Sequence, residues 1–180
     1  MQKLKLQFKN QNGQSLVELI VVATVAVIVV GALTFATIAA LRNAAFSKNQ
    51  TKATKLAQDG LERVRTSRDR GLEVDLLGNP DKKFSDLWGL FLTRDSCSDK
   101  PCLFELTATG SLQQINIPTD VQEVEGLRRY IEISDQAACP PLSSNECYKF
   151  QKQISAVVTW TDFSGPHESR LTTILRNQNI

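Results

Sequence analysis

The chain has 180 residues and a formal net charge of +2, with 21 lysines and arginines against 19 aspartates and glutamates. This near balance excludes a strongly basic nucleic-acid-binding protein, and we expect no specific nucleic-acid partner. When a long apolar run near the N-terminus is set aside, about 140 residues remain, enough for one ordinary domain with one core.

Residues 19–40 carry no charged side chain and are rich in Leu, Ile, Val and Ala. A helix of this length covers roughly 33 Å, more than the ~30 Å hydrocarbon core of a bilayer. Lys3, Lys5 and Lys9 precede the run, which favours a cytoplasmic N-terminus and an extracytoplasmic remainder. The alternatives are an uncleaved membrane anchor without further function and a secretory signal peptide cut near residues 37–40.

One carboxylate, Glu18, stands at the start of this apolar run. A charge within a membrane helix costs about 2.5–3.5 kcal/mol at the bilayer centre and less near the edge, so a partner cation is expected. Arg42 is the next basic residue, too far along a helix to serve. A free amine made by cutting after Gly13 would supply the missing cation.

The segment GQSLVE, residues 13–18, follows a short basic leader and precedes a long apolar helix, and it resembles the prepilin leader of type IV pilins and type II secretion pseudopilins. The resemblance implies that a membrane peptidase cuts between Gly13 and Gln14 and methylates the new amine. It also implies that Glu18 meets the amine of a neighbouring subunit. The family most often has phenylalanine where this chain has Gln14, and many pilins carry a helix-breaking proline that this helix lacks.

The same resemblance implies an organisation and a set of partners. Residues 1–13 are expected to be the leader, 14–41 a transmembrane and assembly helix, and 42–180 an extracytoplasmic globular domain. The partners implied are prepilin peptidase, other pilin or pseudopilin subunits, and a membrane assembly platform. After assembly, the subunit would lie in a cell-surface or periplasmic filament.

Beyond the membrane run, apolar residues recur at three- and four-residue spacing, which predicts an amphipathic helix. These residues are Ala53, Leu56, Ala57, Leu61 and Val64. Arginines crowd the last turns and Gly71 is a candidate cap, so we expect one helix from about Ser15 to Arg70, with Gly60 as a possible bend. The stretch LAQDGLERVR within it resembles minor pilins and pseudopilins.

The remainder is rich in strand signals. Turn residues at 78–80 precede an apolar and aromatic cluster, residues 84–92, which we expect to be core. Strand-like runs follow at 103–108, 112–117 and 127–134, and residues 153–163 and 168–177 predict an antiparallel hairpin around a turn at 164–167. The fold class is therefore α+β, with the second half of the helix packed on a small antiparallel sheet, as the pilin resemblance also implies.

Four cysteines lie in two short-range pairs, Cys97 with Cys102 and Cys139 with Cys147. Three connectivities are possible, but both local pairings are easily reached, and disulfides suit an oxidising compartment. A zinc site is disfavoured because the spacing is too wide and a second histidine is missing. Many pilins have a disulfide-bounded loop near the C-terminus, and the resemblance assigns Cys139 and Cys147 to that role.

No catalytic constellation is recognised, and we expect neither an enzyme nor a metal or cofactor. His167 is the only histidine and sits beside Pro166 in a predicted turn, which favours a surface residue. The sequence thus predicts a structural subunit of a type IV pilus or secretion filament, and the family-like stretches favour a minor subunit. The alternatives are an anchored binding module that does not polymerise and a competence pseudopilin for DNA uptake.

Overall fold

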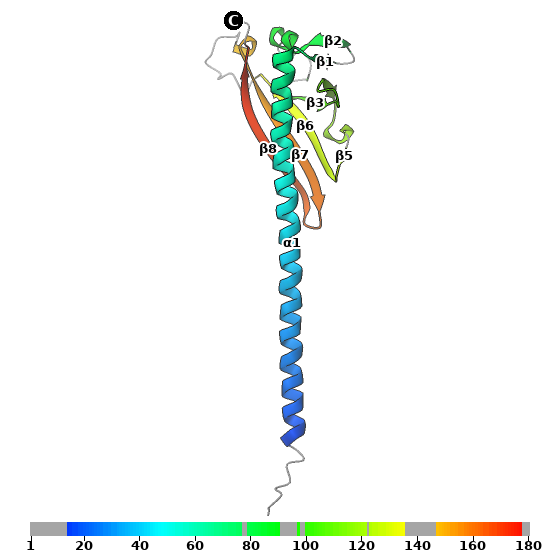
Figure 1. Ribbon diagram of the computed structural model, residues 1–180, viewed down its shortest axis with the longest axis vertical. Helices are drawn as coiled ribbons and strands as arrows, with labels where there is room; N and C mark the ends of the chain where they lie inside the picture. The colour runs from blue at the N-terminus through cyan, green and yellow to red at the C-terminus, as the bar shows by residue number, and fades with distance from the viewer. Residues whose placement is uncertain are drawn as a thin grey trace, which may run out of the picture. The chain divides into compact units, whose positions relative to one another are not determined.

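Figure 1 shows the computed structural model of the protein, which describes residues 14–76, 79–90, 97, 100–121, 123–135 and 147–177. The chain divides into two compact units, a first that ends at Phe46 and a second of residues Ser47–Ile180. The described part of the first unit is helical throughout. The second unit contains the rest of that helix and all of the described strands.

Helix α1 runs from Gln14 to Arg70, which confirms the single long helix predicted from the sequence. Its C-terminal end is closed by Gly71, whose φ of 60° is a left-handed conformation that glycine adopts without strain. The Gly71 N–H donates to the Arg68 carbonyl (3.2 Å) and the Leu72 N–H to the Ser67 carbonyl (2.9 Å). This pair of bonds is the Schellman motif, and it ends the helix where the sequence predicted.

The described strands form one eight-stranded sheet in the order β2-β1-β4-β3-β6-β7-β8, with β5 paired to β6. All pairs are antiparallel except β1 with β4, which is parallel, so the sheet is larger and less uniform than predicted. The strands are β1 (Glu73–Leu76), β2 (Asn79–Lys83), β3 (Cys102–Leu106), β4 (Leu112–Ile115), β5 (Glu123–Val124), β6 (Leu127–Ser134), β7 (Gln151–Asp162) and β8 (Gly165–Arg176). Among the described residues, three short 3-10 helices lie between strands: η1 (Phe84–Gly89), η2 (Pro118–Asp120) and η3 (Cys147–Lys149).

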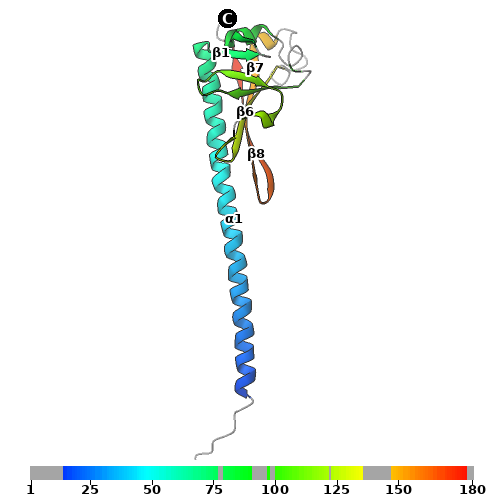
Figure 2. The same ribbon diagram turned by 90° about the vertical axis from the view of Figure 1, so that its right-hand side faces the viewer.

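The hairpin of β7 and β8 is the longest pairing, and its register runs from Gln151 opposite Arg176 to Asp162 opposite Gly165. The predicted hairpin is confirmed, but its turn is shorter than expected. Residues Phe163 and Ser164 make the turn, and His167 lies inside β8 rather than in the turn. Figure 2 shows this hairpin turn at the opposite end of the sheet from β1.

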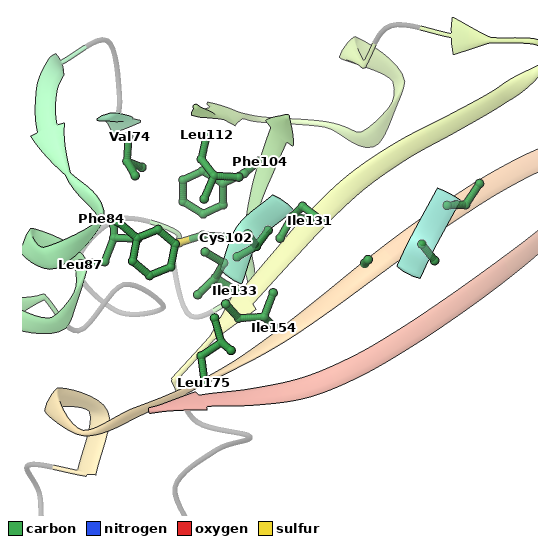
Figure 3. Packing of buried hydrophobic residues seen from close by; sticks show 14 of the residues in the cluster. Val74, Phe84, Leu87, Cys102, Phe104, Leu112, Ile131, Ile133, Ile154 and Leu175 are labelled. Atoms are coloured by element: carbon green, nitrogen blue, oxygen red, sulfur yellow. The ribbon is translucent and has the colours of Figure 1, made fainter. Parts of the chain in front are cut away.

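The main core lies between the second half of α1 and one face of the sheet. Ala53, Ala57 and Val64 of α1 are fully buried in a cluster with strand residues, which confirms the predicted apolar stripe. Figure 3 shows side chains of this cluster that point toward one another, among them Phe104 and Ile131. The aromatic cluster is confirmed as core at Phe84, Leu87 and Trp88, while residues 91 and 92 lie outside the described part.

Gly60 has a packing role within the continuous helix. A Cβ at this position would lie 3.2 Å from Cδ of Arg129 and 3.4 Å from Cβ of Ala156. The Arg129 guanidinium is held there because its Nη1 donates to Asp59 Oδ2 (2.6 Å) and to the Leu56 carbonyl (3.3 Å). The missing side chain therefore allows a close approach between α1 and the sheet.

Candidate functional site

The first unit presents an apolar surface that none of its described residues, 14–46, covers. From Leu16 to Leu41, the large apolar side chains are 44–76% exposed. By length and composition, this part of α1 is able to cross a membrane, and its most apolar window has no buried residue. An apolar surface on all sides of a helix is typical of one that lies in lipid or within a bundle of other helices.

The threonine hydroxyls in this apolar segment are satisfied within the helix. The hydroxyls of Thr24, Thr34 and Thr37 each donate a hydrogen bond of 2.8 Å to the carbonyl four residues earlier. Such back-bonding removes the cost of an unsatisfied hydroxyl in hydrocarbon. The threonines are therefore compatible with a lipid environment.

Glu18 lies one turn after the helix begins at Gln14, and its side chain is exposed. No lysine or arginine occurs between Gln14 and Leu41, so a cation for this carboxylate has to come from outside the segment. Its place near the helix N-terminus is favourable, because the positive end of the helix dipole lies there. Gly13, Lys3, Lys5 and Lys9 lie outside the described residues, and their predicted roles stay predictions.

The cysteine predictions are partly tested. Cys97 and Cys102 form a disulfide with a Cα–Cα distance of 5.4 Å, which confirms the first local pairing. Cys102 is fully buried in the core, and Gln114 Nε2 donates to Cys97 Sγ (3.3 Å). Cys147 is also disulfide-bonded, but its predicted partner Cys139 lies outside the described residues.

A buried ion pair in the second unit was missed by the sequence analysis. Lys152 of β7 and Asp135, just after β6, are in direct contact with side chains 1% and 0% exposed. Lys152 Nζ also donates to the Leu90 carbonyl (3.0 Å) and lies 6.0 Å from the Trp88 ring centroid. Burial lowers the pKa of Lys152, and the Asp135 carboxylate opposes that shift. These contacts connect the start of β7 and the end of β6 to the end of η1.

Asp162, Ser164 and His167 meet at the β7–β8 turn. Asp162 Oδ1 accepts from the Ser164 N–H (2.7 Å) and Oγ (2.6 Å) and lies 2.9 Å from His167 Nε2. The hydrogen bond from Ser164, with further help from His167, lowers the pKa of Asp162 to about 2. His167 also stacks on Trp160 at a centroid distance of 5.3 Å, so it is half-buried rather than a surface residue.

The arrangement of these three residues is not that of a nucleophilic triad. In such a triad, one imidazole nitrogen faces the acid and the other faces the hydroxyl. Here Nε2 lies near both Asp162 Oδ1 and Ser164 Oγ (3.2 Å). The cluster therefore stabilises the turn. Across the part of the chain that the structure describes, no group of three or more His, Cys, Asp or Glu residues could hold a metal ion.

Comparison with known families places a recognised motif on this segment. Residues 8–34 match the family model described as the prokaryotic N-terminal methylation motif. The match covers residues 8–13 of the predicted leader, Gln14, Glu18 and the first part of α1, and does not extend into the second unit. No curated protein and no solved structure matches the chain.

The matched motif is the signature of type IV pilins and pseudopilins, and it confirms the resemblance recognised from residues 13–18. The N-terminal segment thus carries the motif of pilin-like proteins that prepilin peptidase processes, and the motif implies a structural role. The α+β architecture of a long apolar helix on a mostly antiparallel sheet is consistent with a pilin-like fold.

Proposed function

We propose that the protein is a structural subunit, a minor pilin or pseudopilin, of a type IV pilus or a type II secretion-type filament. The observation that carries the proposal is the exposed apolar part of α1 with its single carboxylate, Glu18, inside the matched methylation motif. Residues 14–41 form the membrane and assembly helix, and residues 42–180 are extracytoplasmic.

The exposed apolar surface serves two environments in turn. In the stored subunit it is covered by lipid, and in the filament it is covered by the helices of neighbouring subunits. Because lipid tails and apolar side chains differ little in polarity, transfer between the two environments costs little free energy. A simple membrane anchor needs only the lipid environment. Such an anchor gives no functional reason for the charge at Glu18.

Glu18 gives the assembled state its register. Cleavage between Gly13 and Gln14 creates a positive α-amino group, which a neighbouring subunit offers to the Glu18 carboxylate. Opposite charges attract strongly in a low-dielectric bundle, whereas an unpaired buried charge costs several kcal/mol. A subunit that is shifted along the bundle leaves the charge unpaired, so correctly staggered subunits are preferred.

The N-terminus of the mature protein tests the processing step. Intact-mass analysis of the chain from membranes is expected to show a start at Gln14, with one added methyl group if the amine is modified. A Gly13→Val variant should retain the leader, while Asn12→Ala, at the neighbouring position, should be processed normally. A wild-type chain that keeps Met1, or that begins near Leu41, contradicts processing by prepilin peptidase.

A Glu18→Ala variant tests assembly. We expect normal membrane insertion and loss of the subunit from sheared filaments, because the register contact is missing. Glu62→Ala is the matched control, since Glu62 is an exposed carboxylate on the same helix within the second unit. Normal incorporation of Glu18→Ala would instead support the competing function, an anchored binding module that does not polymerise.

A further inference from the structure

The second unit has one end where two strand turns expose apolar side chains. We call it the turn end and define it by the β5–β6 turn, residues 124–126, and the β7–β8 turn, residues 162–165. Val124 is 53% exposed and Phe163 is 61% exposed. Together the two exposed side chains form an apolar surface that is available for a contact outside the chain.

Contacts within the second unit place the β7–β8 turn beside the first residues of that unit. Arg68 Nη1 donates to the Arg176 carbonyl (3.4 Å), and Thr54 Oγ1 lies 3.5 Å from Ser169 Oγ. Between these two contacts α1 advances about 21 Å and β8 about 23 Å, so strand and helix run alongside each other. From Ser169 to the turn is about 13 Å more, and from Thr54 to Ser47 about 10 Å. The turn therefore reaches the level of Ser47.

The chain enters this end of the unit directly from the apolar segment. Leu41 is followed by Arg42, the first cation after the apolar run, and residues 42–46 alone separate Leu41 from Ser47. Even a fully extended chain covers no more than about 20 Å over that distance. When the apolar segment spans a bilayer, as proposed above, the turn end is held close to the membrane surface.

We propose that the turn end docks on the lipid bilayer, with the Phe163 ring in the interfacial region of the membrane. Aromatic and aliphatic side chains combined with lysines are the usual composition of such interfacial contacts. Lys48 and Lys55 are exposed on the part of α1 that begins the second unit, and they supply cations for lipid phosphates. The contact is small, but the transmembrane tether keeps it at high effective concentration.

The acidic residues at the turn end do not oppose this contact. Asp162, next to Phe163, has a side chain 10% exposed, and its Oδ1 is engaged by Ser164 and His167 inside the turn. Glu125 is paired with Lys52 (2.5 Å). The hydrogen bond from Lys52 lowers the pKa of Glu125, and the charges of Lys52 and Lys48 lower it further. Both carboxylates therefore interact with groups of the protein and do not need partners among the lipid headgroups.

The test is fluorescence quenching of the full chain in vesicles that contain brominated phosphatidylcholine. The Phe163→Trp variant places a probe at the turn, and Phe150→Trp is the matched control. Phe150 is also exposed, at 45%, but lies at the other end of β7, about 40 Å away. The two native tryptophans are buried, and quenching of the wild-type chain is subtracted as background.

We expect loss of fluorescence and a blue shift for Phe163→Trp, and no change beyond background for Phe150→Trp. Equal quenching of both variants, or quenching of neither, overturns the proposal. A blue shift without quenching by brominated lipid also overturns it, because the turn is then covered by another protein subunit. Flotation of the vesicles reports membrane insertion separately, so failure of the proposed anchor is distinguished from failure of the turn contact.

Discussion

The two parts of helix α1 have contrasting relations to the rest of the chain. From Leu16 to Leu41 its large apolar side chains are exposed, whereas Ala53, Ala57 and Val64 are 0% exposed against the sheet. The sequence differs accordingly, with apolar residues on all sides in the first part and at three- and four-residue spacing in the second. The hydrophobic pattern of a helix therefore indicates whether its partner lies within or outside the chain.

The strongest test of this contrast uses one residue type in both parts. Phe104→Ala removes a fully buried ring and should lower the free energy of unfolding of the second unit by about 3–5 kcal/mol. Phe35→Ala removes a ring that is 76% exposed and should change it by less than about 0.5 kcal/mol. Urea unfolding in detergent micelles, followed by tryptophan fluorescence, measures both. Similar losses for both variants would show that the first part of α1 also stabilises the second unit.

A slightly smaller effect is expected at the buried ion pair. Lys152→Met keeps the length of the side chain but leaves Asp135 without its cation, and should cost about 3 kcal/mol in the same assay. The double variant Lys152→Met with Asp135→Asn should lose less than the sum of the two single variants, because the residues are in direct contact. Additive losses in this cycle would mean that the two charges do not stabilise each other.

The two glycines of α1 provide a comparison of intermediate size. Gly60→Val forces a branched side chain against Arg129 and Ala156 and should destabilise the second unit by about 1–3 kcal/mol. A Cβ at Gly31 would meet no atom within 4 Å, so Gly31→Val should leave that unfolding transition unchanged. An unchanged urea midpoint for Gly60→Val would show that the close approach of helix and sheet is not required.

The smallest effect concerns pH. The pKa of Asp162 is about 2 in the folded protein against an ordinary value of 3.8, so its ionised form stabilises the fold above pH 3.8. That contribution is lost as the pH falls from about 4 toward 2. An Asp162→Asn variant should therefore show a shallower decline of urea midpoints over this range. A decline equal to that of the wild-type chain would assign acid sensitivity to other carboxylates.

Periodicity in the sequence was sufficient to predict α1 and the strand pairs with strong alternation. The helix from Ser15 to Arg70, the run 127–134 and the C-terminal hairpin are all present, because each is long and has one dominant period. The Gly71 cap was predictable from an arginine-rich last turn followed by glycine. In the candidate site, Glu18 was found because a charge in an apolar run is costly.

Other features depend on contacts between distant residues. Strands β1 and β2 are short, and the parallel pairing of β1 with β4 joins Val74 to Leu112, which no local pattern specifies. Lys152 had a signal, since it lies two residues before Ile154 and so falls on the core face of β7. Its partner, Asp135, follows the end of β6 and could not be identified without the register of the two strands.

The threonine back-bonds in α1 affect how two such helices recognise each other. Because Thr24, Thr34 and Thr37 use their hydroxyl protons within their own helix, these protons cannot bridge to a neighbour. Between Leu16 and Leu41, van der Waals packing of aliphatic groups permits many angles of rotation about the helix axis at similar energy. In the filament proposed above, Glu18 is the charged residue of this stretch, and its pairing would favour one rotation of the helix about its axis over the others.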